Sequence, residues 1–267
     1  MQDTLEVTQT TVNPLWSGQG CAMEKVCATY AGQFATRMLG KYVADAAHPR
    51  IGIVSAILDV RRYDRDSYYA GVRKVHKGNA IREAKKADRA GLVSKLFAWS
   101  NHIPDIHEIN TSKAVRSGGE MRAAYHRSIE EMGGAPKALA APAAVKCPLH
   151  HTYCWGIFEP RPGHRQGDIV TDEKLLGYIK FKRNGNYAAY SSFLGHGDYL
   201  NLGIMYRLHY AIMDWIFHER AGLSKGLDFI LYGAIDSGGE GLQLWKKRML
   251  FEGARLALDP GARLPSA

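Results

Sequence analysis

Apolar and polar positions alternate along much of the second half of the chain. Residues 175–182 and residues 187–194 both show this alternation, and the dipeptide Asn184-Gly185 lies between them. Asn-Gly between two such runs is a strong signal of a β-hairpin, so we expect two antiparallel strands here. Further runs predict a strand at residues 152–159, a short buried strand at 227–232, and a last strand or extended tail at 249–258.

Apolar residues at a helical spacing predict helices at residues 22–39, 79–90 and 203–221. In the second of these, Ile81, Ala84 and Ala87 can face inward while the basic residues face outward. Additional helices are expected after a cap at Asp64 or Asp66, at residues 120–132 and at residues 238–248.

The first half also contains two predicted strands, at residues 51–60 and 92–99. Residues 1–20 lack a periodic pattern, so we expect a loose arm or an irregular lead-in. The resulting order is β, α, α, β and then hairpin, α, β, α, β. This order predicts an α/β or α+β fold with a mixed sheet.

The composition is that of a soluble globular protein, with 46% hydrophobic and 23% charged residues among 267. No run of about 18 apolar residues occurs, so we expect no membrane span. The polar N-terminus lacks the apolar core of a secretory signal, which favours a cytoplasmic protein. Four cysteines in such a protein are expected to be free thiols rather than a disulfide framework.

Positive charge is concentrated in one part of the chain. The whole chain has a net charge of +9, and residues 61–95 contain eleven Lys or Arg against four Asp or Glu. Such a region favours polyanionic partners such as nucleic acid, a phosphorylated cofactor or an anionic lipid surface. The alternative is a solvated face of basic helices.

Several common enzyme motifs are missing from the sequence. There is no Walker A loop, no G-x-S-x-G elbow, no H-E-x-x-H helix and no G-x-G-x-x-G fingerprint. Their absence argues against a P-loop NTPase, an α/β-hydrolase, a zincin and a dinucleotide-dependent dehydrogenase.

A glycine-bearing loop at Gly195, Gly197 and Gly203 precedes the helix predicted at residues 203–221. Free backbone N–H groups and the helix dipole at such a helix start attract anions. We therefore expect the loop to hold the phosphate groups of a donor. The predicted donor-binding residues are Gly195, Gly197, Asn201, Gly203, Met205 and Tyr206.

Three polar residues near this loop and the last core strand are candidates for catalysis. His196 can act as a general base, because the ordinary pKa of histidine suits proton transfer near neutrality. Asp198 can take the same role or cap the helix start. Asp236 follows a predicted core strand at its carboxyl end, where α/β sheets often bind ligands, although it can equally be a turn residue.

The segment from Asn110 to Gly119 is dense in hydrogen-bonding side chains. Asn110, Ser112 and Arg116 are the expected substrate-binding residues, and Arg116 can bind a carboxylate or phosphate through two parallel hydrogen bonds. A surface loop with a helix cap is the alternative.

Cys147, His150, His151 and Cys154 form the segment C-P-L-H-H-T-Y-C. All four side-chain types bind zinc, and four of them would close a structural site. The spacing is not that of a standard zinc finger, however, and His150 and His151 would point apart in a strand. Core or loop residues are the alternative, and we expect no metal.

The second half resembles the GNAT acetyltransferase superfamily, in particular its FemABX-like acyltransferase branch. The resemblance rests on an apolar helix ending in R-A-G, the strand L-D-F-I-L-Y-G and the helix G-L-Q-L-W-K-K. Tyr68 and Tyr69, followed by a basic helix, add to it in the first half. The matching positions of the second half are Trp215, Gly222, Asp228, Phe229, Gly233, Gly241, Leu242, Trp245, Lys246 and Lys247.

This resemblance implies a GNAT-like mixed, mostly antiparallel central sheet flanked by helices. Residues 50–258 would form a single acyltransferase domain, with residues 1–49 as an N-terminal arm and helix packing on it and residues 259–267 as a flexible tail. The implied activity is N-acyl transfer from acyl-CoA to an amine acceptor, either a small molecule or a peptide. An aminoacyl-tRNA donor is the alternative within this family.

Two positions depart from the family pattern. The loop G-H-G-D-Y-L-N-L-G lacks the usual pyrophosphate signature [QR]-x-x-G-x-[GA], which leaves the donor open. Trp245 stands where many GNAT enzymes carry a tyrosine acid, so the resemblance assigns proton donation to Tyr232 or to water. A non-catalytic nucleic-acid-binding protein that uses the basic helices is the competing interpretation.

Overall fold

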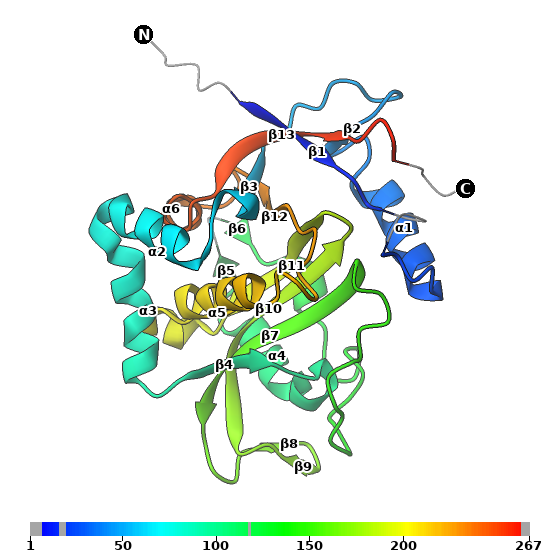
Figure 1. Cartoon of the computed structure of the whole chain (residues 1–267). Coiled ribbons are helices and arrows are strands. Elements are labelled where there is room, and N and C mark those ends of the chain that lie inside the picture. Colours follow the sequence, from blue (N-terminus) through cyan, green and yellow to red (C-terminus); the bar gives the residue numbers. More distant parts are fainter. Residues whose placement is uncertain (1–6, 16–19, 117–118, 263–267) are drawn as a thin grey trace.

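A nine-stranded sheet is the centre of the computed structural model, which describes residues 7–15, 20–116 and 119–262 (Figure 1). The strand order is β1-β13-β3-β12-β11-β10-β7-β4, and β2 pairs with β13. These strands are β1 (Thr8–Val12), β2 (Val43–Ala44), β3 (Ser55–Asp59), β4 (Val93–Leu96), β7 (His150–Pro160), β10 (Glu173–Asn184), β11 (Tyr187–Gly195), β12 (Phe229–Ala234) and β13 (Glu252–Leu258). Two small hairpins lie outside the sheet, β5 (Val115–Arg116) with β6 (Gly119–Glu120) and β8 (Arg165–Gln166) with β9 (Ile169–Val170).

Helices cover both faces of the sheet. One face carries α2 (Arg65–Lys74), α3 (Asn79–Arg89), α5 (Ile204–His218) and α6 (Glu240–Arg248), and the other carries α1 (Lys25–Arg37) and α4 (Ile103–Thr111) (Figure 1). The alternation of side chains along the strands produces this division. In β3, Ala56 and Leu58 join the cluster packed under the first group, whereas Ile57 joins the cluster under α1.

The predicted hairpin is present, with its turn one residue later than expected. Asn184 pairs with Tyr187, so Gly185 and Asn186 form the turn. Gly185 has a φ of +68°, and a Cβ at this position would lie 2.2 Å from the carbonyl oxygen of Asn13. The turn therefore requires glycine both for its backbone conformation and for the close approach of the N-terminal segment.

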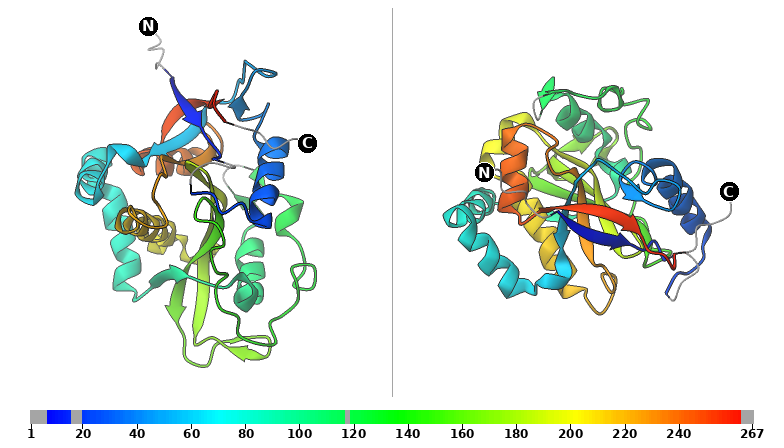
Figure 2. Two further views of the ribbon diagram at one scale, coloured as in Figure 1. Left: turned by 45° about the vertical axis from the view of Figure 1, so that its right-hand side comes forward. Right: turned by 90° about the horizontal axis from the view of Figure 1, so that it is seen from above.

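The prediction of an irregular lead-in was wrong for β1. Thr8–Val12 pairs in parallel with β13, from Thr8 opposite Ala254 to Val12 opposite Leu258, and Figure 2 shows the two strands side by side. The pairing partner lies at the other end of the chain, and only Val12 in this strand is fully buried. The local pattern of apolar and polar residues therefore did not indicate this strand.

The helix predicted at residues 120–132 was also wrong. Glu120 belongs to a two-stranded hairpin, and Ala123–Tyr125 forms a single 3-10 turn. The backbone N–H of Met121 donates to the carbonyl oxygen of Ala114 at 3.1 Å, and the Met121 side chain packs on the cluster below α4. The start of this segment therefore pairs with the residues that precede it, and no α-helix follows among the described residues 120–132.

The cap of the second helix and the mixed sheet are confirmed. Asp64 caps α2 through a reciprocal pair of hydrogen bonds with Ser67. The sheet contains both parallel and antiparallel pairs, as the order of elements predicted. Within the described residues, no helix combines the length and the apolar character needed to cross a bilayer.

Candidate functional site

Strands β11 and β12 diverge and open a cleft in the middle of the sheet. They pair in parallel only from Tyr187 opposite Phe229 to Ala189 opposite Leu231. Beyond this point β11 remains paired with β10, and β12 remains beside β3, so each strand has one edge free toward the other. The cleft has a volume of about 670 Å³ and reaches from α1 to α6.

Both strands are irregular where the cleft opens. In β11, Tyr190 pairs with Phe181 and Ser192 pairs with Lys180, which leaves Ser191 as an extra residue. In β12, the register against β3 shifts between Leu231 and Ala234, so Tyr232 and Gly233 lie in a second irregularity. Bulges of this kind re-aim side chains and are common beside active sites. Ser191, Tyr232 and Gly233 all line the cleft.

The walls of the cleft are strongly basic. Six cationic side chains line it against one acidic side chain, Glu120. They come from α1 and the segment after it, from the β5–β6 region, from β10 and from α6, which are far apart in the sequence. This excess of positive charge favours an anionic ligand. The six are Arg37, Lys41, Arg116, Arg122, Lys182 and Lys246.

Lys182 is the basic residue best suited to proton transfer. It lies on β10, and its ammonium group donates to Oε1 of Gln33 and lies 4.7 Å from the centre of the Tyr30 ring. Burial, assisted by the positive charge of Arg37, lowers the pKa of Lys182 to about 8. A minor fraction of the Lys182 side chains therefore carries a neutral amine near neutral pH. No local signal in the sequence distinguishes Lys182 from the other basic residues of this strand, Lys174, Lys180 and Arg183.

Tyr232 is the predicted catalytic residue that the structure places in the cleft. Its ring packs between Phe193, at 4.8 Å between ring centres, and Trp245, at 5.8 Å. Burial raises the pKa of Tyr232, so the phenol stays protonated near neutral pH. Lys246 lies below it and donates to the carbonyl oxygens of Ala234 and Ser237, which holds the turn after β12 in place.

Two of the predicted substrate-binding residues meet the glycine loop. Arg116 donates at 2.7 Å to the carbonyl oxygen of Gly195 and to Oγ of Ser112. Oγ of Ser112 also accepts from the backbone N–H of Gly197 at 2.9 Å. Arg116 lines the cleft, but these bonds are to protein groups, so it positions the end of β11. Asn110 is buried and accepts a hydrogen bond from the Tyr178 hydroxyl.

The other predicted catalytic residues lie outside the cleft lining. His196 is buried, with Nδ1 accepting from the backbone N–H of Asp198 and Nε2 lying 3.1 Å from Oε1 of Glu108. Because Nδ1 accepts, the neutral ring carries its hydrogen on Nε2 and donates it to Glu108. The side chains of Asp198 and Asp236 are exposed to solvent.

The predicted donor-binding residues also lie outside the cleft lining. Gly203 has a φ of +69°, and a Cβ there would lie 2.2 Å from the carbonyl oxygen of Glu83 in α3. The start of α5 is therefore covered by α3. Met205 is buried against Gly195, Tyr206 accepts from Arg248, and Asn201 is exposed. Phosphate binding by these residues stays a prediction.

The four side chains considered as possible zinc ligands, Cys147, His150, His151 and Cys154, separate into two groups. Cys147 and His150 point to the same place, with Sγ and Nδ1 3.4 Å apart. His151 packs on Tyr153 instead, and Cys154 lies on β7 opposite Lys180. The two partners that join Cys147 and His150 are Cys21 and Cys27. Sequence reasoning missed them because they precede Cys147 by more than 100 residues.

Comparisons with known proteins found matches among solved structures. No family model and no curated protein sequence matches the chain. FemX is 11% identical with a TM-score of 0.49, over 76% of this chain and 59% of that one. L-PGS from Bacillus licheniformis is 8% identical with a TM-score of 0.41, over 75% and 58% of the two chains. A tandem GNAT protein from the clavulanic acid biosynthesis pathway is 17% identical with a TM-score of 0.38, over 78% and 54%.

The chain thus spans less than two thirds of the length of each of these matched chains. The architecture of this chain follows from its own strand order and strand pairing. Five of the strand pairs in the large sheet are antiparallel and three are parallel, and helices lie on both faces. The sheet is mixed and mostly antiparallel with helices on both faces, which agrees with the architecture expected from the sequence.

Proposed function

We propose that the protein is an N-acyltransferase whose donor and acceptor meet in the cleft between β11 and β12. The observation that carries this proposal is the divergence of two parallel strands, each with a bulge and a free edge. Free backbone N–H groups along such an edge can hold an extended acyl group and stabilise a developing oxyanion. The basic lining suits the phosphate or carboxylate groups of the two substrates.

In the proposed reaction, the acceptor amine attacks the acyl carbonyl carbon. A C–N bond forms, and the C–S bond of a thioester or the C–O bond of an aminoacyl ester breaks. Neutral Lys182 takes the proton from the amine, and Tyr232 supplies the proton to the leaving group. The lowered pKa of Lys182 supports its role as a base, because part of the amine is neutral near pH 7. The buried Tyr232 phenol keeps its proton, which supports its role as the donor.

The donor is either an acyl-CoA or an aminoacyl-tRNA. The basic residues of the region that contains α2 and α3 support the tRNA alternative. Of the eleven basic residues between positions 61 and 95, six form no ion pair with any described residue. Such unpaired charges are available to phosphates. These six are Arg73, Lys74, Lys77, Arg82, Lys85 and Arg89. The same surface would also serve a nucleic-acid-binding protein without catalytic activity.

The first experiment compares the melting temperature of the protein with acetyl-CoA, longer acyl-CoAs and charged tRNA. A donor that binds the native state at 100 times its Kd stabilises it by about 2.7 kcal/mol, which raises the melting temperature by several degrees. Donors that produce a shift are then incubated with amine acceptors, and the acylated product is detected by mass spectrometry.

A blocking variant locates the binding site. Ser191→Trp fills the mouth of the cleft and should abolish both the thermal shift and the transfer. Ser100→Trp introduces the same side chain at an exposed position outside the cleft lining and should preserve both. If no donor shifts the melting temperature of the wild type and no acyl product forms, the transferase proposal is wrong. Binding of tRNA without transfer would favour the nucleic-acid-binding alternative.

A further inference from the structure

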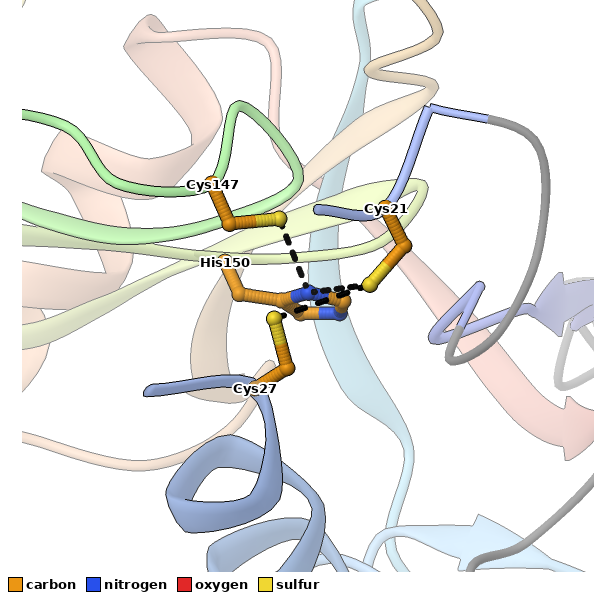
Figure 3. A group of neighbouring side chains, drawn as sticks. All are labelled: Cys21, Cys27, Cys147 and His150. Carbon is orange, nitrogen blue, oxygen red and sulfur yellow. Dashed lines mark hydrogen bonds between the residues drawn. The ribbon is translucent and has the colours of Figure 1, made fainter. Parts of the chain in front are cut away.

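Three cysteines and one histidine converge from three separate segments of the chain (Figure 3). Cys21 precedes α1, Cys27 lies in the first turn of α1, Cys147 lies in the loop before β7, and His150 begins β7. The three Sγ atoms and Nδ1 of His150 all lie within 4.8 Å of one another. Cys27, Cys147 and His150 are buried, with at most 6% of each side chain exposed.

The distances suit a tetrahedral zinc ion. Zn–S bonds of about 2.3 Å and Zn–N bonds of about 2.0–2.1 Å place ligand atoms about 3.8 Å apart for S–S pairs and about 3.5 Å apart for S–N pairs. Cys21 Sγ lies 3.6 Å from Cys27 Sγ and 3.6 Å from Nδ1 of His150. Cys147 Sγ lies 3.4 Å from the same nitrogen. Small movements of the longer pairs would complete the tetrahedron.

The histidine ring is already held in the form that binds a metal. Nε2 of His150 lies 2.8 Å from the carbonyl oxygen of Pro14, which can only accept a hydrogen bond. Nε2 therefore carries the hydrogen, which leaves the lone pair free on Nδ1, the nitrogen that lies beside the sulfur atoms (Figure 3). A hydrogen bond from the second ring nitrogen to a carbonyl is the usual support of a zinc-binding histidine.

Backbone N–H groups also point at the sulfur atoms. The N–H of Ala22 donates to Sγ of Cys147 at 3.5 Å, and the N–H of Met23 donates to Sγ of Cys21 at 3.4 Å. Such bonds favour the thiolate, which is the form of cysteine that binds zinc.

We propose that Cys21, Cys27, Cys147 and His150 form a structural zinc site. Four protein ligands close the coordination shell, so the ion would have no position for substrate or water. Thiolate and imidazole ligands select zinc over magnesium or calcium. This proposal replaces the sequence-based expectation that no metal is needed, and it stands independently of the proposed function.

The site would fasten α1 to the rest of the molecule. Cys21 and Cys27 flank the start of α1, whereas Cys147 and His150 lie beside the first residues of β7. One and two turns further along α1, Tyr30 and Gln33 contact Lys182 in the cleft. Loss of the ion should therefore lower the stability of the protein and loosen one wall of the cleft.

Metal analysis of the purified full-length protein is the first test. The wild type, purified without chelator under reducing conditions, should contain about one zinc per chain, as a closed site of this kind requires. Cys27→Ser and His150→Ala should each reduce the zinc content about tenfold, because each variant removes one of the four ligands and weakens zinc binding. Cys154→Ser is the matched control, since this cysteine lies on β7 outside the cluster, and it should retain the metal.

A second measurement does not depend on whether the variants fold. Wild-type protein is stripped with a chelator, reduced and titrated with Co²⁺. The expected result is the intense visible absorption of tetrahedral Co²⁺ with a thiolate charge-transfer band, which disappears when one equivalent of Zn²⁺ is added. A wild type that carries no zinc and gives no such spectrum would overturn the proposal. So would an intact mass showing a disulfide among the three cysteines of freshly purified protein.

Discussion

The hydroxyl group of Tyr190 lies 2.7 Å from Nδ1 of His209, and both side chains are buried. The other ring nitrogen of His209 lies 2.8 Å from the hydroxyl group of Tyr68. A neutral imidazole has one donor and one acceptor, so one tyrosine accepts from the ring and the other donates to it. This arrangement ties β11 to α5 and α2 directly beside Ser191, where the cleft opens.

His209 should make the stability of the protein depend on pH. Burial lowers the pKa of His209 from 6.5 to about 3 in the folded state. Between these two pH values the unfolded chain therefore binds more protons than the folded protein. The contribution of His209 to stability is fully present above about pH 6.5 and is lost as the pH decreases toward 3. From pH 7.5 to pH 5 we expect a loss of about 2 kcal/mol from this group. His151, whose pKa burial lowers to about 4, acts in the same direction.

Urea unfolding of the wild type and of His209→Gln at the two pH values measures this effect. The glutamine side chain does not titrate in this range. The change in the free energy of unfolding between pH 7.5 and pH 5 should therefore be about 2 kcal/mol smaller in the variant than in the wild type. It should also be less stable than the wild type at both values, because two buried hydroxyl groups lose their shared partner. An unchanged pH dependence in the variant would contradict the neutral, buried state of His209.

Gly203 and Gly91 form a matched pair for testing the contact between α3 and α5. Their φ values are +69° and +70°, but a Cβ would lie 2.2 Å from the carbonyl oxygen of Glu83 at Gly203 and would meet nothing within 4 Å at Gly91. Gly91→Ala should cost about 1–2 kcal/mol for its backbone conformation alone. Gly203→Ala should cost about 1–3 kcal/mol more, because the helices must move apart. If thermal or urea unfolding showed equal losses of stability in Gly203→Ala and Gly91→Ala, the close contact between α3 and α5 would be contradicted.

Replacing Lys182 should test its proposed role as the general base. Lys182→Met should lower kcat about 100-fold or more with the donor and acceptor found by the assays above. In the wild type, activity should rise with pH through about 8 as the amine loses its proton, and this rise should disappear in the variant. Lys225→Met, at an exposed position outside the cleft lining, is the control. A variant that keeps both its rate and its pH profile would remove Lys182 from the mechanism.

The basic surface of α3 should determine any binding of tRNA. Replacing Arg82 and Lys85 together by Gln should weaken the affinity for tRNA and reduce the slope of log affinity against log salt by roughly 1–2. Arg62→Gln is the comparison, because Arg62 is already paired with Glu252 at 2.6 Å and should matter less. Fluorescence titration at several salt concentrations gives both quantities. If the wild type shows no salt-dependent tRNA binding, the donor is an acyl-CoA or another small molecule.

Part of the candidate site could be predicted from the sequence. The resemblance assigns proton donation to Tyr232 or to water, and Tyr232 lines the cleft. Arg116 and Ser112 were chosen for their hydrogen-bonding groups, and they do meet the loop at Gly195 and Gly197. Lys182 was not named, because its special environment depends on Gln33 and Tyr30 from a helix about 150 residues earlier.

The sequence by itself determined the order of most elements, the hairpin between β10 and β11, the cap at Asp64 and the basic character of α3. These features depend on side chains within a few positions of one another, where periodicity and turn residues are sufficient. The same local signals predicted the fold class.

Only the tertiary structure decided which distant segments meet. β1 pairs with β13 at the other end of the chain, and β11 and β12 separate after three paired positions. Cys21 reaches His150 across 129 positions, although the sequence had grouped His150 with its neighbours His151 and Cys154. Such contacts depend on how whole elements pack against one another, which no local pattern of residues encodes.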